Sequence, residues 1–288
     1  MDDKIQIGII GGSGLYDMQE LSDITAVSLD TPFGKPSDDY IIGTLEGVRI
    51  AFLPRHSNGH KLIPSEINFR SNIYGFKQLG VSRIISVTAV GSLAENIHPL
   101  DIVIPDQFYD CTKHRESTFF GKGLAAHIAF ADPTCCDIAA LLYETAVETG
   151  SPVHRGGTLI CIEGPAFSTR AESNLYRRWG MDIIGMTSIQ EAKLSREAEI
   201  CYAAMALVTD YDCWHDEETD VTAAAVIENL EKNIAQAKRI IRATVPKIPP
   251  ARDCTCAKAL EKAMMTAAES IPDETRRDLA PILDKYLS

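Results

Sequence analysis

The chain of 288 residues lacks any long apolar run. No stretch reaches the roughly 18 apolar residues from which a membrane-spanning helix is recognised. Its first residues, Met-Asp-Asp-Lys, also lack the charged start and apolar stretch that are typical of a secretory signal peptide. We therefore expect a soluble, cytoplasmic protein with no membrane partner.

Positive charge is also scarce. The chain has 28 Lys and Arg residues against 40 Asp and Glu residues, which gives a formal net charge of −12. Nucleic acids and anionic membranes bind basic surfaces, so this balance argues against either partner. A phosphate-binding site in this chain would have to be a local positive site on an acidic protein.

Paired cysteine motifs are absent. None of the eight cysteines forms a C-x-x-C pair, and no histidine lies at zinc-finger spacing from them. The pattern therefore predicts no metal site, and most of the cysteines are expected to be packed free thiols. An alternative stays open for Cys254 and Cys256, whose separation by one residue could reflect a redox-active or stabilising disulfide.

Strand and helix patterns alternate along the chain, which has 45% hydrophobic and 24% charged residues, as is usual for a globular protein. Buried strands are expected at residues 5–10, 40–45, 48–53, 83–89, 101–106, 158–162 and 200–208. Helical spacing of apolar residues predicts helices over 69–79, 138–150, 226–241 and, beyond a proline-rich break, 260–267. The alternation predicts an α/β fold with a central, mixed but largely parallel twisted β-sheet flanked by helices.

Functional residues are expected just after the strands, because sites in such sheets form at the carboxyl ends of the strands. The first strand runs into Gly-Gly-Ser-Gly at 11–14, a turn that could aim amides and the Ser13 hydroxyl at an anion. This turn is no dinucleotide fingerprint, because Asp17 stands where the last glycine of G-x-G-x-x-G belongs, and no Lys-Ser/Thr pair follows to make a phosphate-binding P-loop. A plain tight turn is an equally good interpretation.

Other strand ends carry polar groups as well. Arg55 offers a fork of donors suited to phosphate, and His56 could donate or be charged near neutral pH, although a surface arginine and a loop histidine would look the same. Small residues around Thr88 and Ala89 would let a ligand approach backbone amides. Thr187 lies just before a further helix that is expected to begin at Ile189-Gln190-Glu191, and its hydroxyl could bind an anion or simply cap that helix.

Two carboxylates, Asp210 and Asp212, follow the last predicted strand within Thr-Asp-Tyr-Asp-Cys-Trp. Carboxylates this close suggest acid–base work, while a metal site is disfavoured because no further carboxylate or histidine cluster lies near in sequence. A solvated loop remains the alternative. The segment Glu-Gly-Pro-Ala-Phe-Ser-Thr-Arg at 163–170 is another strand-to-helix turn with an aromatic ring and hydroxyls.

Taken together, these motifs resemble the trimeric purine nucleoside phosphorylase and methylthioadenosine phosphorylase family. The most specific segments are Asp-Thr-Pro-Phe-Gly-Lys-Pro-Ser at 30–37 and Thr-Asp-Tyr-Asp-Cys-Trp at 209–214, and the others occur in the same order along the chain. The likeness runs from about residue 5 to residue 245. It implies one phosphorylase domain over 1–288, with a catalytic core at 5–245 and a helical C-terminal tail at 251–288 packing on that core.

The resemblance also implies a role for each matching residue. Implied phosphate contacts are Ser13, Arg55, His56, Thr88, Ala89 and Thr187. Around the base it implies Asp210 as the catalytic residue together with Tyr211, Asp212 and Ser168, and around the ribose Met186 and Phe167. Ala223 and Val226 would line the 5′ pocket, and His127 would reach into the pocket of a neighbouring subunit.

The implied reaction is phosphorolysis of 5′-methylthioadenosine in methionine and purine salvage, by a homotrimer or a dimer of trimers. Phosphate is a co-substrate there, with no cofactor. The chemistry of the residues agrees, because a protonated Asp210 could donate to N7 of a departing purine and an ionised Asp212 could accept from the N6 amine of adenine. Phosphorolysis of 6-oxopurine nucleosides or methylthioinosine, and a non-catalytic nucleoside-binding protein, remain as alternatives.

Overall fold

The computed structural model describes residues 4–12, 15, 20–215 and 223–287, and side chains at 223–226 fall outside that description. Its strands are β1 (Ile7–Gly11), β2 (Ser22–Val27), β3 (Tyr40–Leu45), β4 (Val48–Pro54), β5 (Arg83–Ser92), β6 (Ile102–Ile104), β7 (Gln107–Asp110), β8 (Val153–Arg155), β9 (Thr158–Cys161), β10 (Ile183–Gly185) and β11 (Cys201–Asp210). Its α-helices are α1 (Phe69–Gln78), α2 (Cys136–Glu148), α3 (Arg170–Arg178), α4 (Ser188–Glu197), α5 (Ala223–Thr244), α6 (Asp273–Asp278) and α7 (Ala280–Leu287). Four short 3₁₀ turns complete the described elements: η1 (Pro64–Glu66), η2 (Val245–Lys247), η3 (Thr255–Lys258) and η4 (Ala268–Ser270).

All these strands join one mixed sheet, which confirms the predicted fold class. Its main path is β2-β3-β4-β1-β5-β10-β9-β7, and β11 adds β6 and β8 beside β5. The central pairs β4–β1, β1–β5 and β5–β11 are parallel, whereas β10 pairs antiparallel with only the last residues of β5. The sheet therefore forks at the carboxyl end of β5, which leaves that end between β10 and β11.

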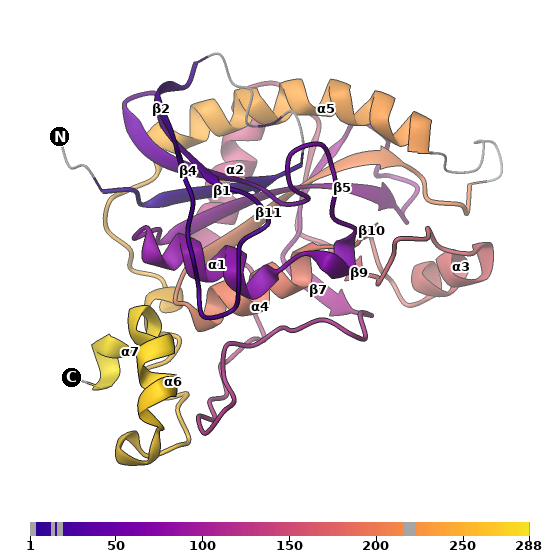
Figure 1. Ribbon diagram of the computed structural model, residues 1–288. Helices are drawn as coiled ribbons and strands as arrows, with labels where there is room; N and C mark the ends of the chain where they lie inside the picture. The colour runs from indigo at the N-terminus through magenta and orange to yellow at the C-terminus, as the bar shows by residue number, and fades with distance from the viewer. Residues whose placement is uncertain (1–3, 13–14, 16–19, 216–222, 288) are drawn as a thin grey trace.

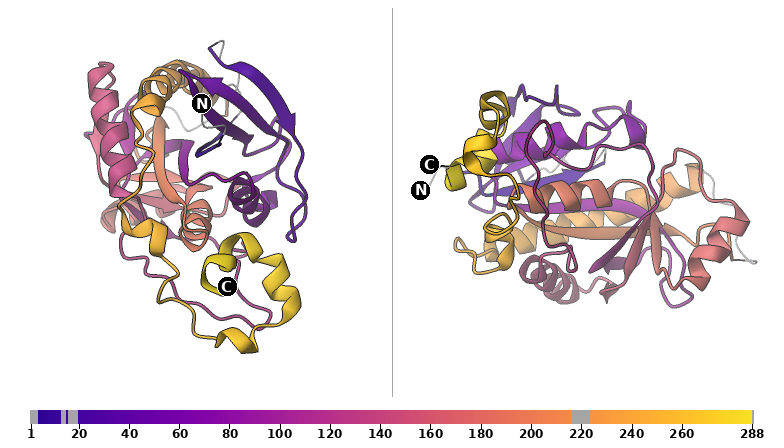
Figure 2. Two further views of the ribbon diagram at one scale, coloured as in Figure 1. Left: turned by 90° about the vertical axis from the view of Figure 1, so that its left-hand side faces the viewer. Right: turned by 90° about the horizontal axis from the view of Figure 1, so that it is seen from below.

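Helices cover both faces of the sheet (Figures 1 and 2). On one face α5 and α2 pack against each other and on β11, and on the other α1 and α4 lie side by side, with α4 against β11. The central strand β11 is almost entirely apolar, as is typical of strands covered on both faces. In β11, the nine residues before Asp210 are all buried.

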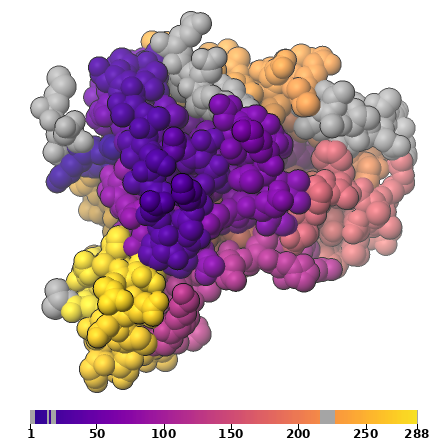
Figure 3. Space-filling model, in the orientation of Figure 1, coloured from indigo at the N-terminus to yellow at the C-terminus, as the bar shows by residue number. Residues whose placement is uncertain are grey.

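The C-terminal tail forms a lobe beside the core, visible in yellow in Figure 3. Its apolar residues Leu260, Ile271, Leu279, Ile282 and Leu283 belong to the same buried cluster as residues of α1 and β11. The predicted helix over 260–267 is wrong. These residues form turns, because their backbone groups bond elsewhere: the Leu260 amide donates to Glu199, and Met264 pairs with Ala126 in an isolated bridge.

No helix among the described residues is both long and apolar enough to cross a membrane.

Candidate active site

The glycine-rich turn and the Arg55 segment lie side by side at the carboxyl ends of two parallel strands. Gly11, the last residue of β1, is in register with Pro54 of β4, and the Arg55 amide donates to the Gly11 carbonyl at 2.9 Å. Ser13, two residues further on, lies outside the described residues. Gly11, where the glycine-rich segment begins, and Arg55 are 44 residues apart in sequence and thus meet at one end of the sheet.

Arg55 is buried, at 2% exposure, and its donors are directed into the protein. Nε donates to Glu191 Oε1 at 2.5 Å, and Nη2 donates to Ser86 Oγ at 2.7 Å and Glu191 Oε2 at 3.2 Å. Nη1 donates to the Val87 carbonyl at 2.9 Å. Within the described residues, these four bonds leave one of the five guanidinium N–H groups for another acceptor. Glu191 occupies most of the fork and pairs the charge of Arg55, so a phosphate contact from this residue stays a prediction that rests on the remaining N–H.

Glu191 is in turn held by several donors. Beyond the Arg55 contacts, its Oε2 accepts from Ser86 Oγ at 2.7 Å and from the Tyr202 hydroxyl at 3.0 Å. A buried ion pair is tolerated when its remaining lone pairs are satisfied in this way. The network joins the end of β4 to β5, α4 and the start of β11, so it ties these four elements together.

His56 is neutral rather than charged near neutral pH. Burial, followed by repulsion from Arg55, lowers the pKa of His56 to about 4. Its Nδ1 lies 2.8 Å from the Leu62 carbonyl, which can only accept, so Nδ1 carries the proton and Nε2 keeps its lone pair. The lowered pKa disfavours a charged ring near neutral pH, which was one of the two possibilities that the sequence left open. Nε2 can instead accept the proton of a hydrogen phosphate ion.

The N-terminus of α4 carries the partial positive charge of the helix dipole, which can attract an anion where the charge of Arg55 is already paired. Thr187 is the N-cap residue of this ten-residue helix and is 4% exposed, yet its side chain makes no capping bond. Capping alone therefore does not explain the residue, and its hydroxyl is left at a helix end that favours anions. The preceding Gly185 packs against Ala89 and Val90 of β5, which brings the segment alongside Thr88 and Ala89.

A β-bulge directs Asp210 into the fork of the sheet. In the β11–β5 pairing Val208 faces Val90, but Asp210 already faces Gly91, so Thr209 is the extra residue. Such a bulge re-aims the side chain that follows it. A Cβ on Gly91 would lie only 2.8 Å from Asp210 Oδ1, so only glycine leaves room for this carboxylate.

The surroundings of the Asp210 carboxyl group favour its protonated form. Burial raises its pKa, against the lowering effect of hydrogen bonds from Thr209 and the Asp212 amide. Oδ1 accepts from the Asp212 amide at 2.8 Å, and Oδ2 lies 2.6 Å from Thr209 Oγ1, which also reaches the Val90 carbonyl at 3.2 Å. Because Thr209 has one hydroxyl hydrogen for two acceptors, a proton on Asp210 Oδ2 satisfies all three groups.

Asp212 lies one turn further on with φ of 52°, a left-handed conformation that aspartate tolerates and most residues do not. It is 7% exposed, and burial raises its pKa. Its Oδ2 and the hydroxyls of Ser168 and Ser173 are buried and make no hydrogen bond of ordinary geometry within the described residues, although both serines lie close enough to lower the pKa of Asp212. Polar side chains therefore gather around the Asp212 carboxylate, at a place that suits a polar ligand.

The loop before α3 closes over this place. The Cys213 thiol donates to the Ser168 carbonyl at 3.3 Å, which joins this loop to the Asp212 turn. Met186 packs directly against Gly164. Phe167, in contrast, is 47% exposed, so its ring is not enclosed by its own chain.

The remaining predicted residues lie in varied positions. Tyr211 stacks on His215 with ring centroids 4.6 Å apart, so it braces the turn that holds Asp210 and Asp212. His127 is exposed, and its amide donates to Ala263 of the C-terminal tail at 2.8 Å. Ala223 and Val226 lie in the first turn of α5, and their side chains are outside the description.

Sequence reasoning missed three residues that position the site. Asn229 and Asn233, one turn apart on α5, donate to the carbonyls of Thr209 and Val208 at 2.7 and 2.8 Å and so hold the bulge. Arg115 donates to the Glu163 and Met186 carbonyls. The only available signal was a pair of asparagines at helical spacing among apolar residues, and nothing marked Arg115.

The argument against a metal site rested on the spacing of the cysteines along the sequence, and the folded chain contradicts it. Cys135, Cys201, Cys254 and Cys256 come from separate parts of the chain, yet their sulfur atoms lie within 4.8 Å of one another. Cys254 and Cys256 are both free thiols in the structure.

Comparison with known proteins places the chain in a family. The sequence model of the phosphorylase superfamily matches residues 6–246. The chain belongs to this superfamily. A relative from Geobacter sulfurreducens named S-methyl-5′-thioadenosine phosphorylase is 58% identical over 282 residues, which cover 98% of this chain and 99% of the relative. One from Gloeobacter violaceus with the same name is 57% identical over 98% of this chain and 96% of its own length.

Solved structures of other superfamily members superpose closely. A methylthioadenosine phosphorylase sourced from an antarctic soil metagenomic library matches with a TM-score of 0.93 and 50% identity, covering 97% of this chain and 99% of that one. Methylthioadenosine phosphorylase from Schistosoma mansoni in complex with adenine matches with a TM-score of 0.85 and 35% identity, covering 94% and 100%. The resemblance inferred from the motifs is thereby confirmed over nearly the whole chain.

Proposed function

We propose that this chain is a pentosyltransferase that converts 5′-methylthioadenosine and phosphate into adenine and 5-methylthioribose 1-phosphate, a step of methionine and purine salvage. One observation carries the proposal: two buried carboxyl groups, Asp210 and Asp212, lie at the fork of the sheet with raised pKa values. The names of the full-length relatives support the same reaction.

The departing purine needs a proton or a strong hydrogen bond at N7. Burial raises the pKa of Asp210 and so favours its protonated form, whose Oδ2 proton can turn from Thr209 Oγ1 to N7 when the purine is bound. The adenine N6 amine is a donor, and Asp212 Oδ2 is a buried acceptor that can receive it. This pairing favours adenine over hypoxanthine, which presents an acceptor at the same position.

The phosphate ion acts as nucleophile and as counter-charge for the cationic ribose of the transition state. The positive end of α4, the hydroxyls of Thr88 and Thr187 and the one spare N–H of Arg55 provide donors, and we assign Ser13 to the same pocket by family resemblance. His56 Nε2 accepts the phosphate proton. Because the Arg55 charge is already paired with Glu191, amides and hydroxyls carry most of the binding. No cofactor takes part in this scheme.

We also propose that the working form is a homotrimer or a dimer of trimers, in which neighbouring subunits complete the ribose pocket. Phe167, assigned to the ribose, is exposed on its own chain, and so is His127, assigned to a neighbour's 5′ pocket. Sedimentation of the protein tests the assembly, and a monomer with full activity would overturn it.

The test of the proposed reaction is adenine release from 5′-methylthioadenosine with and without phosphate. Release that requires phosphate and exceeds hypoxanthine release from methylthioinosine by at least tenfold is expected. Equal rates without phosphate would identify a hydrolase, and faster hypoxanthine release would identify a 6-oxopurine enzyme. Tight nucleoside binding without turnover would identify a non-catalytic binding protein.

A further inference from the structure

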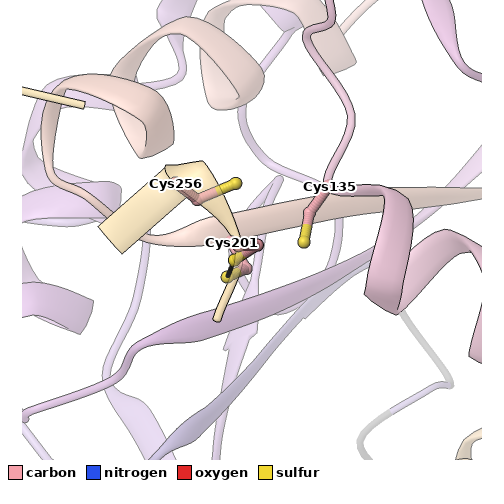
Figure 4. A group of neighbouring side chains, drawn as sticks. Cys135, Cys201 and Cys256 are labelled. Carbon is pink, nitrogen blue, oxygen red and sulfur yellow. Dashed lines mark hydrogen bonds between the residues drawn. The ribbon is translucent and has the colours of Figure 1, made fainter. Parts of the chain in front are cut away.

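Four cysteine sulfurs converge at the junction between the C-terminal tail and the core, at the opposite end of β11 from Asp210. Cys135 is the N-cap residue of α2, Cys201 begins β11, and Cys254 and Cys256 flank the start of η3 in the tail. All four sulfur atoms lie within 4.8 Å of one another, and Figure 4 shows the thiols of Cys135, Cys201 and Cys256 gathered around a common centre. We propose that these four side chains bind one zinc ion as a tetrahedral thiolate site.

The spacing of the sulfurs suits a single small ion. Four thiolates at the usual zinc–sulfur distance of about 2.3 Å form a tetrahedron whose edges are about 3.8 Å long. Here Cys201 Sγ and Cys254 Sγ are 3.3 Å apart, and no pair exceeds 4.8 Å. An iron–sulfur cluster has a core several atoms across and would hold its cysteines further apart. Four sulfur ligands in a tetrahedron select zinc among common single ions.

Positive charge beside the cluster balances the complex. Four thiolates and Zn²⁺ together carry a charge of −2. Arg252 Nη1 lies 3.8 Å from Cys201 Sγ, and Arg83 lies close enough to Cys201, Cys254 and Cys135 to interact with them electrostatically. Cys135 also caps the positive end of α2. Two guanidinium groups thus match the excess charge of the metal complex.

Arg83 also holds the segment before Cys254 against the core. Its Nη2 donates to the carbonyls of Pro249 at 2.5 Å and Ala251 at 2.8 Å, directly before Cys254. Three of the ligands are buried and Cys254 is half-buried, so the site is shielded but has an entry path. The ion would fasten the tail to β11 and α2, and through the tail the segment of His127, whose amide bonds to Ala263.

The competing chemistry is disulfide formation. The same four sulfurs could form two disulfides if an oxidant removed four electrons and the thiols released four protons. Cys254 and Cys256, separated by one residue, are the pair that the sequence brought to attention. Zinc binding instead leaves every sulfur reduced and releases protons only. The two outcomes differ in mass and in reactivity toward alkylating agents.

The experiment uses the full chain, purified under reducing conditions, stripped with a chelator and supplied with zinc or cobalt. The wild type is expected to bind about one zinc per chain, and Co²⁺ to give the intense visible and near-ultraviolet bands of tetrahedral thiolate coordination. Cys254→Ser is expected to bind zinc at least tenfold more weakly. Cys136→Ser is the matched control, because Cys136 is exposed and adjacent to Cys135 but lies outside the cluster.

The midpoint of heat unfolding provides a second measurement. Zinc is expected to raise the unfolding midpoint of the wild type and of Cys136→Ser, but not that of Cys254→Ser. If the reduced wild type binds no more zinc than Cys254→Ser and gives no thiolate cobalt bands, the proposal is wrong. The proposal is equally wrong if the protein isolated from cells carries two disulfides among these four cysteines. Peptides that contain these cysteines would then resist alkylation without prior reduction, and their linked masses would be lower than those of the free thiols. The wild-type cobalt spectrum decides the matter even if Cys254→Ser fails to fold.

Discussion

Replacing Asp210 with asparagine separates proton donation from hydrogen bonding at the purine. In this variant Oδ1 can still accept from the Asp212 amide, which it now does at 2.8 Å. The new amide nitrogen can donate to Thr209 Oγ1 or to N7, since Asn is nearly the same shape as Asp. What the variant cannot do is transfer a proton, because an amide has none to give at neutral pH.

The expected loss follows from that single change. A positioned general acid contributes about 10²- to 10⁴-fold to a rate, which corresponds to about 3–5 kcal/mol of transition-state stabilisation. We expect kcat for 5′-methylthioadenosine to fall by that factor while KM changes little. Activity that needs the acid form is lost as pH rises through the raised pKa of Asp210, so the alkaline limb of the pH–rate profile should disappear in the variant.

The assay compares 5′-methylthioadenosine with its N7-methylated analogue, whose base already carries positive charge and leaves without a proton. Wild type and Asp210→Asn should differ strongly on the first substrate and by less than about tenfold on the second. Asp212→Asn serves as the control, because it changes the group facing N6 and leaves the acid in place. Near-wild-type turnover of 5′-methylthioadenosine by Asp210→Asn would refute the role of Asp210 as an acid.

Three further predictions concern packing and buried charge. Gly91→Ala places a Cβ 2.8 Å from Asp210 Oδ1 and should lower kcat at least tenfold with an unchanged circular dichroism spectrum; full activity would show that the carboxylate has room to move. Arg55→Met leaves Glu191 as an uncompensated buried charge and should lower the free energy of unfolding in urea by about 3–5 kcal/mol. Adding Glu191→Gln should recover part of that loss. An unchanged free energy of unfolding in Arg55→Met would contradict the buried network. Burial raises the pKa of Glu197 to about 7, so the folded state binds the Glu197 proton more tightly than the unfolded state does. The free energy of unfolding should therefore rise by up to about 3 kcal/mol as the pH falls from 8 toward 4.5. A Glu197→Gln variant whose unfolding free energy depends on pH in the same way would disprove this assignment.

Much of the fold was readable from periodicity and turn residues. The strands β3 and β4 lie where they were expected, and the turn between them consists of Glu46 and Gly47, both with positive φ. The strand before Thr209 and the helices α1, α2 and α5 also lie where apolar spacing placed them. The tail failed because its apolar residues have helical spacing but their backbone groups are used by partners distant in sequence, such as Glu199.

The positions of the candidate site residues were predictable, but their electrostatics were not. Arg55, His56 and Asp210 lie at strand ends as expected, because apolar runs and the residues that follow them suffice to place them there. Their charge states depend on burial and on partners far along the chain, such as Glu191 for Arg55. The cysteine cluster was missed for the same reason, because spacing rules capture local ligand pairs and not sulfurs that converge from three segments, as Cys135 and Cys201 do.

The most direct measurement of the central claim follows the phosphorus atom. When the purified protein is mixed with 5′-methylthioadenosine and phosphate, ³¹P nuclear magnetic resonance should show inorganic phosphate converted to a sugar 1-phosphate, with one equivalent of adenine released for each phosphate consumed. Adenine released while the inorganic phosphate signal stays constant would contradict the account, because the base would then have left without phosphate as the nucleophile.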